Sequence, residues 1–477
     1  MGDLAWVASP GDWVGRLLFQ RALAATYLLA FLGTALQFRA LLGERGILPI
    51  ARFVAAVPFR QAPSLFHLRA SDRVVASVAW TGVAVSAALL LGLGDVVPLA
   101  GSMALWAVPW VLYLSIVNVG QRWYSFGWEV LLCEAGFLAI FLGPADVAPP
   151  TLVLWMLRWL LLRLELGAGL IKLRGDPCWR DLTCLRYHHE TQPLPGPLSW
   201  WFHHLPDGIH RIEVAANHVT QLVAPLLLLA PQPVAGWAAL VMVVTQLWLV
   251  VSGNFSWLNT LTITIALPAL GGGLLGPLVP VDPPADLADP PAWSAAVVVA
   301  LAVVVALLSL RPVRNLVAPK GRQRMNASFD PLRLVNTYGA FGSITRVRRE
   351  VVIEGRRSPG EDWQEYGFKA KPGDPMRRPR QVAPYHLRLD WLMWFAALAP
   401  SQHRRWLDPL LERLLRADPD VRRLIGHDPF GDEPPQTVRA RMYEYRFTTR
   451  TERRETGAWW VRQPLGVVVG PLRLRQS

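Results

Sequence analysis

The stretch WSAAVVVALAVVVALLSL (Trp293–Leu310) decides the fold class, because none of its 18 residues is charged. An α-helix of about 20 apolar residues crosses the hydrocarbon core of a bilayer, so the stretch predicts a transmembrane helix. Directly after it the composition changes. The first 310 residues carry 16 Lys and Arg against 17 Asp and Glu, whereas residues 311–477 carry 32 against 18. We therefore expect a nearly neutral membrane domain, 1–310, and a basic soluble domain, 311–477, called the tail below.

Apolar segments of similar length recur throughout the membrane domain. Hydrophobic residues make up 52% of the chain and charged residues only 17%, whereas soluble proteins carry about a quarter charged residues. We predict a polytopic α-helical membrane bundle of eight or nine transmembrane helices, with the lipid bilayer as a partner. Eight is the alternative because the fourth and sixth segments carry ionisable side chains. The nine segments are Leu17–Leu36, Val74–Leu93, Val96–Val119, Gly127–Leu142, Thr151–Ile171, Ile212–Ala230, Val234–Val251, Leu258–Leu278 and Trp293–Leu310.

Basic residues gather in alternate loops between these spans. Six arginines lie in the loop 37–73, Arg122 lies in the third loop, and Lys172 and four arginines lie in the loop 172–211. The second, fourth, sixth and eighth loops contain no Lys or Arg. With nine spans, the basic loops and the basic tail share one face. The positive-inside rule then places that face in the cytoplasm and the N-terminus outside.

The tail carries a net charge of +14, which could attract nucleic acid, anionic lipid or an acidic protein. No RNA-recognition, zinc-finger or helix-turn-helix signature occurs in it, so we predict no nucleic-acid partner. Alternating residues predict strands over 344–354, 363–371 and 438–448, the second as the hairpin partner of the first. Helices are expected over 389–398 and 404–415. The tail is therefore predicted to be a β-rich α+β domain, and it shows no nucleophile–base set.

Three ionisable side chains, Arg163, Glu165 and Lys172, lie in the apolar run WLLLRLELGAGLIKL of the fifth span. Such groups are costly in a membrane, and each invites a functional hypothesis. Lys172 is the only lysine before the tail in a chain with 44 arginines. A buried amine can lose its proton and act as a base, which arginine cannot do. The alternatives are an ion-pair network with Glu129 and Glu134, and ordinary snorkelling of Lys172 at a span end.

The loop 172–211 is rich in His and Trp, and His188, His189 and Glu190 are its candidate site residues. Adjacent histidines point to opposite sides of a helix or strand, and no HExxH or CxxC spacing occurs. We therefore predict no metal site. An interfacial or re-entrant hairpin with Trp and His at headgroup depth is favoured instead. Cys178 and Cys184 lie in the same loop, and both a disulfide and two free thiols are open.

Five long strings in one order make the chain resemble the lipase maturation factor family along almost its whole length. This resemblance implies a membrane-embedded, chaperone-like maturation or assembly factor for secreted or membrane-associated hydrolases such as lipases. A lipase-like client protein would be its partner. Animal members of the family are endoplasmic-reticulum membrane proteins needed for folding and dimer assembly of secreted lipases. The strings are GAGLIKLRGDPCWRDLTCLRYHHETQPLPGPLSWWFHHLP (Gly167–Pro206), NTYGAFGSITRVRREVVIEG (Asn336–Gly355), WQEYGFKAKPGD (Trp363–Asp374), APYHLRLDWLMWFAAL (Ala383–Leu398) and YEYRFTTRTERRETGAWWVR (Tyr443–Arg462).

A shorter run, AGLIKL followed by Asp and Trp within Gly167–Trp179, is similar to the segment of vitamin K-dependent carboxylases that carries a catalytic lysine. By this resemblance Lys172 would deprotonate a reduced quinone. The alternative function is therefore a membrane enzyme with Lys172 as general base for a quinone-like substrate. Outside this alternative no cofactor is expected. The side chains that would shape the pocket are Arg163, Glu165, His188 and His189.

Two features weigh on the choice of function and of membrane. The absence of a complete catalytic set in the tail favours the assembly factor over an enzyme. The excess of arginine over lysine is typical of a bacterial protein, so we favour a bacterial cytoplasmic membrane. For a eukaryotic protein, the resemblance implies the endoplasmic-reticulum membrane.

Overall fold

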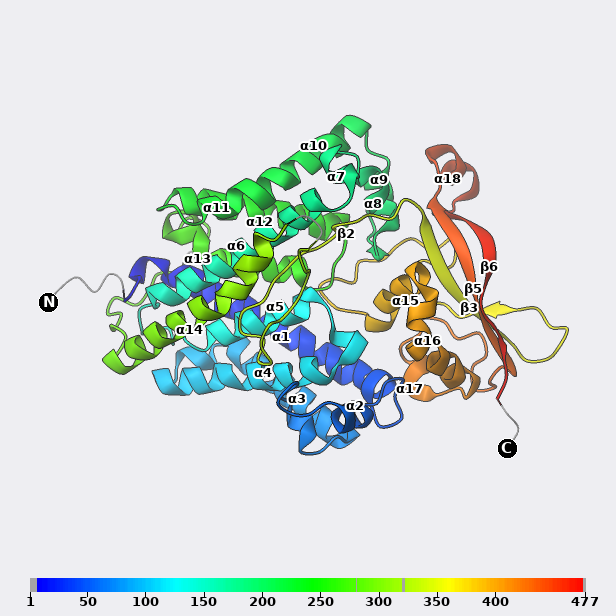
Figure 1. Ribbon diagram of the computed structural model, residues 1–477, viewed down its shortest axis with the longest axis horizontal. Helices are drawn as coiled ribbons and strands as arrows, with labels where there is room; N and C mark the ends of the chain where they lie inside the picture. Colours follow the sequence, from blue (N-terminus) through cyan, green and yellow to red (C-terminus); the bar gives the residue numbers. More distant parts are fainter. Residues whose placement is uncertain (1–6, 280, 320–321, 475–477) are drawn as a thin grey trace.

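The computed structural model describes residues 7–279, 281–319 and 322–474. Figure 1 shows a bundle of long helices on one side and a small sheet with its own helices on the other. Six helices in the described ranges are long and apolar enough to cross a membrane, which confirms the predicted membrane bundle. They are α1 (Trp13–Leu42), α3 (Asp72–Leu90), α4 (Leu99–Val119), α12 (Val234–Ser252), α13 (Leu258–Leu275) and α14 (Ala292–Leu316).

Two further predicted spans form helices that are shorter or more charged, α5 (Gly127–Ala139) and α6 (Thr151–Arg174). All residues of α5 except Phe137 are buried, including Glu129 and Glu134. α6 packs against α13, α14 and α5. The charged side chains of both helices are therefore surrounded by protein rather than by lipid, which is where a membrane protein tolerates such groups.

The span predicted over 212–230 lies in one helical run that contains a π-helical turn and ends before Ala230. The chain forms α10 (Asp207–His218), a π-helical turn η6 (Val219–Val223) and the short helix α11 (Ala224–Leu227). Pro225 has no N–H to donate to the carbonyl oxygen four residues earlier, so the helix cannot continue in α geometry. The π-helical turn lies where this run faces α6, and its Gln221 contacts both Glu165 and Lys172.

The three basic loops all contact the tail, which confirms that they share one face. In α1, at the start of the first loop, Gln37 donates from Nε2 to the carbonyl oxygen of His386 at 2.8 Å. In the third loop the carbonyl oxygen of Trp123 accepts from Arg388 at 2.6 Å. In the loop 172–211 a carboxylate oxygen of Glu190 accepts from a tail N–H at 2.6 Å. The first loop also holds the short helix α2 (Ile50–Ala56).

The tail is built on a four-stranded antiparallel sheet in the order β4-β3-β5-β6. The central strands are β3 (Arg348–Arg356) and β5 (Thr437–Phe447), and helices α15 (Arg388–Leu398) and α16 (Pro400–Leu415) accompany them. α16 is amphipathic, with apolar residues buried at helical spacing. These four elements confirm the predicted strands and helices of the tail.

Two parts of the tail differ from the prediction. Of the expected hairpin partner over 363–371, only β4 (Gln364–Glu365) pairs with β3, so the predicted length of this strand is wrong. The longest strand, β6 (Trp460–Leu472), was not predicted. It follows α18 (Arg450–Thr456), which has a capping box at Thr449 and ends at Gly457 in the left-handed region. A further short helix, α17 (Pro419–Arg422), lies between α16 and β5.

Bundle and tail share a hydrophobic core. α14 runs past Leu310 to Leu316, and the chain then returns along the bundle (Figure 1). The side chains of Arg388 and Glu129 form an ion pair at 2.6 Å that joins α15 to α5, with side-chain exposures of 1% and 0%. A buried charge held by a buried partner joins the tail to the membrane helices directly.

Candidate functional site

The candidate residues do not form one site; they occupy separate groups along α6 and the loop that follows it. That loop contains three short helices, α7 (Pro177–Arg180), α8 (Leu185–Thr191) and α9 (Ser199–His203). A two-stranded pairing of β1 (Leu194–Pro195) with β2 (Gly253–Asn254) connects the loop to the end of α12.

Arg163 belongs to a buried polar group that holds the tail segment after α14. Its guanidinium pairs with Glu134 of α5 and donates to the carbonyl oxygen of Asn336 at 2.6 Å. Glu134 also accepts from the side chain of Asn336 at 2.8 Å and from the hydroxyl of Tyr338 at 2.6 Å. The predicted pairing of α6 with Glu134 is confirmed. Glu129, the other expected partner, instead pairs with Arg388.

Glu165 and Lys172 meet the end of α10 and the π-helical turn η6, which lie opposite α6. Lys172 donates from Nζ to the side-chain oxygens of Gln221 at 2.7 Å and Asn217 at 3.0 Å, and it lies 5.0 Å from the ring centroid of Trp179. Glu165 accepts from the side-chain amide of Gln221 at 3.0 Å, and from that of Gln246 in α12 at 2.7 Å. Every polar group named here has a partner, as buried polar networks require. Lys172 is therefore a buried member of a hydrogen-bonded network that joins α6 to the helix opposite it.

His188 is packed as an aromatic residue. Its ring lies parallel to that of Phe255, at 6.0 Å between centroids, and edge-on to that of Phe341, at 4.9 Å. Burial lowers the pKa of His188 to about 3. The side chain is therefore neutral at physiological pH, and it serves the packing between the loop and the segment that precedes β3.

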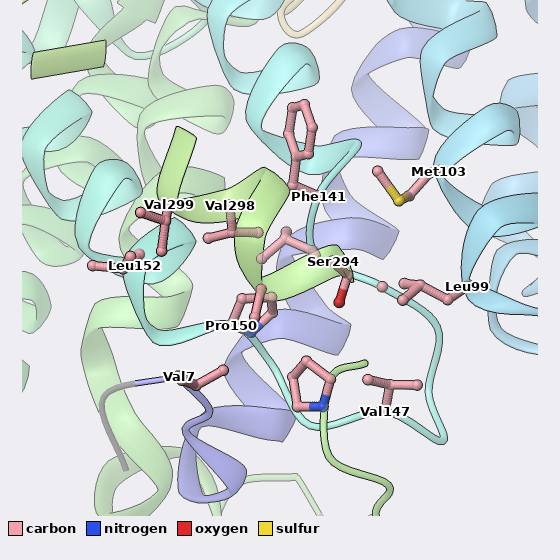
Figure 2. Close-up of a pocket in the computed structure, with 14 residues that line it drawn as sticks. Val7, Leu99, Met103, Phe141, Val147, Pro150, Leu152, Ser294, Val298 and Val299 are labelled. Atoms are coloured by element: carbon pink, nitrogen blue, oxygen red, sulfur yellow. The ribbon is translucent and has the colours of Figure 1, made fainter. Parts of the chain in front are cut away.

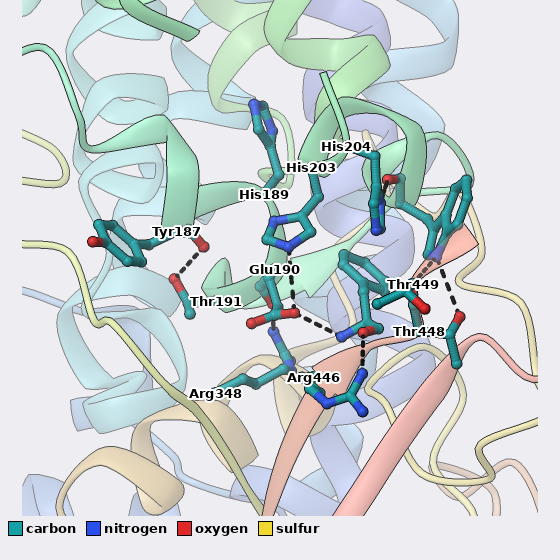
Figure 3. A network of polar contacts seen from close by, with 12 residues as sticks. Tyr187, His189, Glu190, Thr191, His203, His204, Arg348, Arg446, Thr448 and Thr449 are labelled. Atoms are coloured by element: carbon teal, nitrogen blue, oxygen red, sulfur yellow. Dashed lines mark hydrogen bonds and ion pairs between the residues drawn. The ribbon is translucent and has the colours of Figure 1, made fainter. Parts of the chain in front are cut away.

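Glu190 connects the loop to the sheet, as Figure 3 shows. It accepts from the N–H of Phe447 at 2.6 Å and lies 3.6 Å from Nε2 of His203. Burial raises the pKa of Glu190. Arg348 of β3, which is fully buried, donates to the backbone carbonyl oxygens of Glu190 at 2.8 Å and Pro193 at 3.1 Å. The loop and the tail are therefore one structured unit.

The predicted interfacial hairpin is wrong for most of the loop. His188, His189 and Trp200 are 7%, 3% and 5% exposed, respectively, and are covered by protein. The indole of Trp200 donates to the carbonyl oxygen of Thr448 at 2.8 Å. The sheet, rather than lipid headgroups, supplies the partner that this amphipathic side chain needs.

Cys178 and Cys184 form a disulfide in the same unit, so the first of the two open alternatives applies. The bond closes a short turn between α7 and α8, and both cysteines are buried in a small apolar cluster with Trp179 and Val214. Cys133 in α5 is free and buried.

Sequence reasoning missed residues that complete these groups from far along the chain. Arg348, Arg388 and Asn336 are examples, and each lies more than 150 residues from its partner. A weak signal existed in β3, where Arg348 and Glu350 share a strand face with Val352. Charges alternating into an apolar face indicate a buried ion pair.

A pocket lies at the opposite end of the bundle, between the start of α14 and the start of α4 (Figure 2). Val7, Leu99, Phe141 and Val298 are among its lining residues, and Ser294 supplies the one hydroxyl among the described residues that line it. None of the described side chains that line this pocket is titratable.

Known proteins match both halves of this architecture. A family model described as lipase maturation factor transmembrane domain matches residues 14–275, and one described as lipase maturation factor C-terminal domain matches residues 334–470. Over 96% of this chain and 89% of the relative, the sequence is 42% identical to Lipase maturation factor 1 of Bos taurus. The identity is 40% to Lipase maturation factor 1 of Homo sapiens, over 97% of this chain and 88% of that protein.

Lipase maturation factor 2 of Homo sapiens is 29% identical over 95% of this chain and 82% of that protein. No solved structure matches the chain. These relatives are animal proteins, so the predicted bacterial membrane has no support from them. Both family models and the long alignments lead to one conclusion. The chain is a multi-pass membrane protein that belongs to the lipase maturation factor family.

Proposed function

We propose that the chain is a membrane-embedded maturation factor that assists the folding or assembly of lipase-like client proteins. The observation that carries this proposal is the match to lipase maturation factors through both the bundle and the tail. The joined loop and tail support it, because they hold a structured surface at one end of the membrane helices (Figure 1). The bundle anchors this surface, and the client binds outside the membrane.

The client is proposed to bind along the β6 edge, defined here by Leu465 and Val467. β6 is the last strand in the order of the sheet, and these two side chains are 50% and 61% exposed. An edge strand offers unpaired backbone groups to an extended segment of another chain. At the start of β6, the guanidinium of Arg453 lies 3.6 Å from the ring centroid of Trp459, so a partly exposed cation lies beside this edge.

The face that carries the tail is proposed to lie in an oxidising compartment, such as the endoplasmic-reticulum lumen. The Cys178–Cys184 disulfide supports this orientation, since such bonds persist in secretory compartments and are rare in the cytosol. The animal relatives support it too. The proposal is opposite to the cytoplasmic orientation predicted from the positive-inside rule. Secreted clients would be folded on the same side.

The test is secretion of an active dimeric lipase from cells that lack their own maturation factor and express this chain. The double variant Leu465→Lys/Val467→Lys puts two charges on the edge, and Val347→Lys is the matched control because it changes an exposed valine (42%) just before β3. We expect the double variant to bind the client lipase at least about tenfold more weakly. This change corresponds to a loss of about 1.4 kcal/mol or more of binding free energy. Equal lipase secretion by the double variant and the control, at equal membrane abundance, would contradict β6 as the client site.

The alternative, a membrane enzyme acting on a quinone-like substrate, depends on Lys172. Arginine could donate to Gln221 and Asn217 and lie over Trp179 as Lys172 does, but it cannot lose its proton. Lipase secretion by Lys172→Arg at the wild-type level would support a structural cation. A variant that reaches the membrane normally yet is inactive would favour the enzyme.

A further inference from the structure

Three side chains from two helices meet between α8 and α10: His189, His210 and Glu213, called the His189 cluster below. Nδ1 of His210 lies 3.1 Å from Oε2 of Glu213, and Nε2 of His189 lies 3.9 Å from the same oxygen. One ligand atom from each residue lies within 4.8 Å of the others. His189 and His210 are each 3% exposed. The cluster is therefore compact, buried and built from groups that bind metals.

An ion pair between His210 and Glu213 leaves His189 unexplained. Both ring nitrogens of His189 are buried, and neither has a hydrogen-bond partner among the described residues. The 3.9 Å separation from Glu213 is too long for a hydrogen bond. A buried polar group without a partner costs about 1–3 kcal/mol. An unpartnered imidazole close to a carboxylate and a second imidazole is an arrangement typical of metal ligands.

Two of the three separations between ligand atoms are close to those of metal coordination. Zinc binds His nitrogen and carboxylate oxygen at about 2.0–2.2 Å in tetrahedral geometry, which puts neighbouring ligand atoms about 3.3 Å apart. The observed 3.1 and 3.9 Å lie on either side of that value. His210 and Glu213 stand three residues apart and so lie on one face of α10, while His189 approaches from α8.

The surroundings of the cluster orient its ligands. The indole of Trp248 donates to Oε1 of Glu213 at 2.9 Å, which leaves Oε2 for a metal. The ring of Phe202 lies 5.4 Å from that of His189 and shields it. Figure 3 shows the side chain of His189 pointing away from that of its neighbour Glu190. The two residues thus serve different groups, Glu190 the sheet and His189 the cluster.

We propose that His189, His210 and Glu213 bind one zinc ion, with water in the fourth position. Two imidazoles and one carboxylate form a three-residue ligand set known from zinc proteins. The ion would satisfy His189 and connect α8, which is docked on the tail, to α10 of the bundle. The proposed client function is not needed for this inference.

The experiment uses the purified full chain in detergent, stripped with a strong chelator, incubated with zinc, passed through a desalting column and analysed for metal content. About one zinc ion per chain is expected in the wild type. His210→Ala and Glu213→Gln should retain less than about a tenth of this amount, because even loss of a second-shell partner weakens metal binding about 10–100-fold. His427→Ala, which removes an exposed histidine of the tail, should bind zinc like the wild type.

A second variant covers the case in which His210→Ala does not fold. His210→Cys keeps a metal ligand and should give a thiolate-to-cobalt charge-transfer band with Co(II) that the wild type does not show. Trp248→Phe keeps all three ligands and should bind zinc about 10–100-fold more weakly. The proposal is overturned if the wild type retains no zinc, if Glu213→Gln retains as much as the wild type, or if Co(II) bound to His210→Cys lacks the thiolate band.

Discussion

Breaking the ion pair between Arg388 and Glu129 is expected to destabilise the union of tail and bundle by several kcal/mol. Nη1 of Arg388 lies 2.6 Å from Glu129 and 2.6 Å from the carbonyl oxygen of Trp123. The guanidinium carbon also lies 3.4 Å from the ring centroid of Tyr124. Both charged side chains are essentially inaccessible, at 1% and 0% exposure. Removing one partner of a buried pair leaves an uncompensated charge and costs about 3–5 kcal/mol, so Arg388→Met should lower the free energy of unfolding by that amount.

The assay is equilibrium denaturation in mixed micelles followed by tryptophan fluorescence, since Trp257 lies close to Arg388, 5.7 Å away. Glu129→Gln/Arg388→Met leaves no unpaired ion and should recover most of the loss, because apolar or neutral replacement of a whole buried pair is often tolerated. The control is Arg404→Met, which breaks an ion pair with Asp408 that is 45% and 40% exposed. Such a pair contributes less than about 1 kcal/mol.

Two results would refute this reasoning. In the first, Arg388→Met costs no more than Arg404→Met, so burial adds nothing to the pair. In the second, the double variant loses the sum of the two single losses, so the charges do not interact.

Three further predictions concern pH, packing and the disulfide. Burial holds the pKa of His386 well below 6.5, so only the unfolded chain takes up this proton as the pH falls below about 6.5. This one group should lower the free energy of unfolding by about 1 kcal/mol between about pH 6.5 and 5.5, and His386→Phe should reduce the total drop by about that amount. A Cβ at Gly175 would lie 2.0 Å from the carbonyl oxygen of Gly342, so Gly175→Ala should cost about 1–3 kcal/mol in denaturation. Gly208→Ala, with nothing within 4 Å, should not. Cys178→Ser removes the disulfide that closes a loop between cysteines six positions apart, and it should lower the free energy of unfolding by about 2 kcal/mol. Alkylation of both thiols in the unreduced native wild-type protein, detected by mass spectrometry, would contradict the disulfide.

The amino-acid sequence determined the features that depend on local periodicity and composition. Apolar runs of membrane length predicted the long helices. The alternation of basic loops predicted that these loops and the tail lie on the same side of the bundle. Period-two patterns predicted β3 and β5. β6 was missed because Pro464 and Pro471 interrupt its pattern. Prolines are tolerated there because an edge strand has one side without ladder hydrogen bonds.

Only the tertiary structure decided which charged groups meet. Glu129 and Arg388 are 259 positions apart, and the spacing of residues around either one carries no information about the other. In the sequence His189 has only His188 as a neighbouring histidine, and adjacent histidines cannot share one metal ion. In the folded chain α10 brings His210 and Glu213 beside His189. The sequence determined that Arg163, Glu165 and Lys172 must be sheltered from lipid, because an unpaired charge in hydrocarbon is too costly. The partners that shelter them come from whatever the long-range packing of helices and tail brings within hydrogen-bonding distance, and that packing is a property of the whole chain.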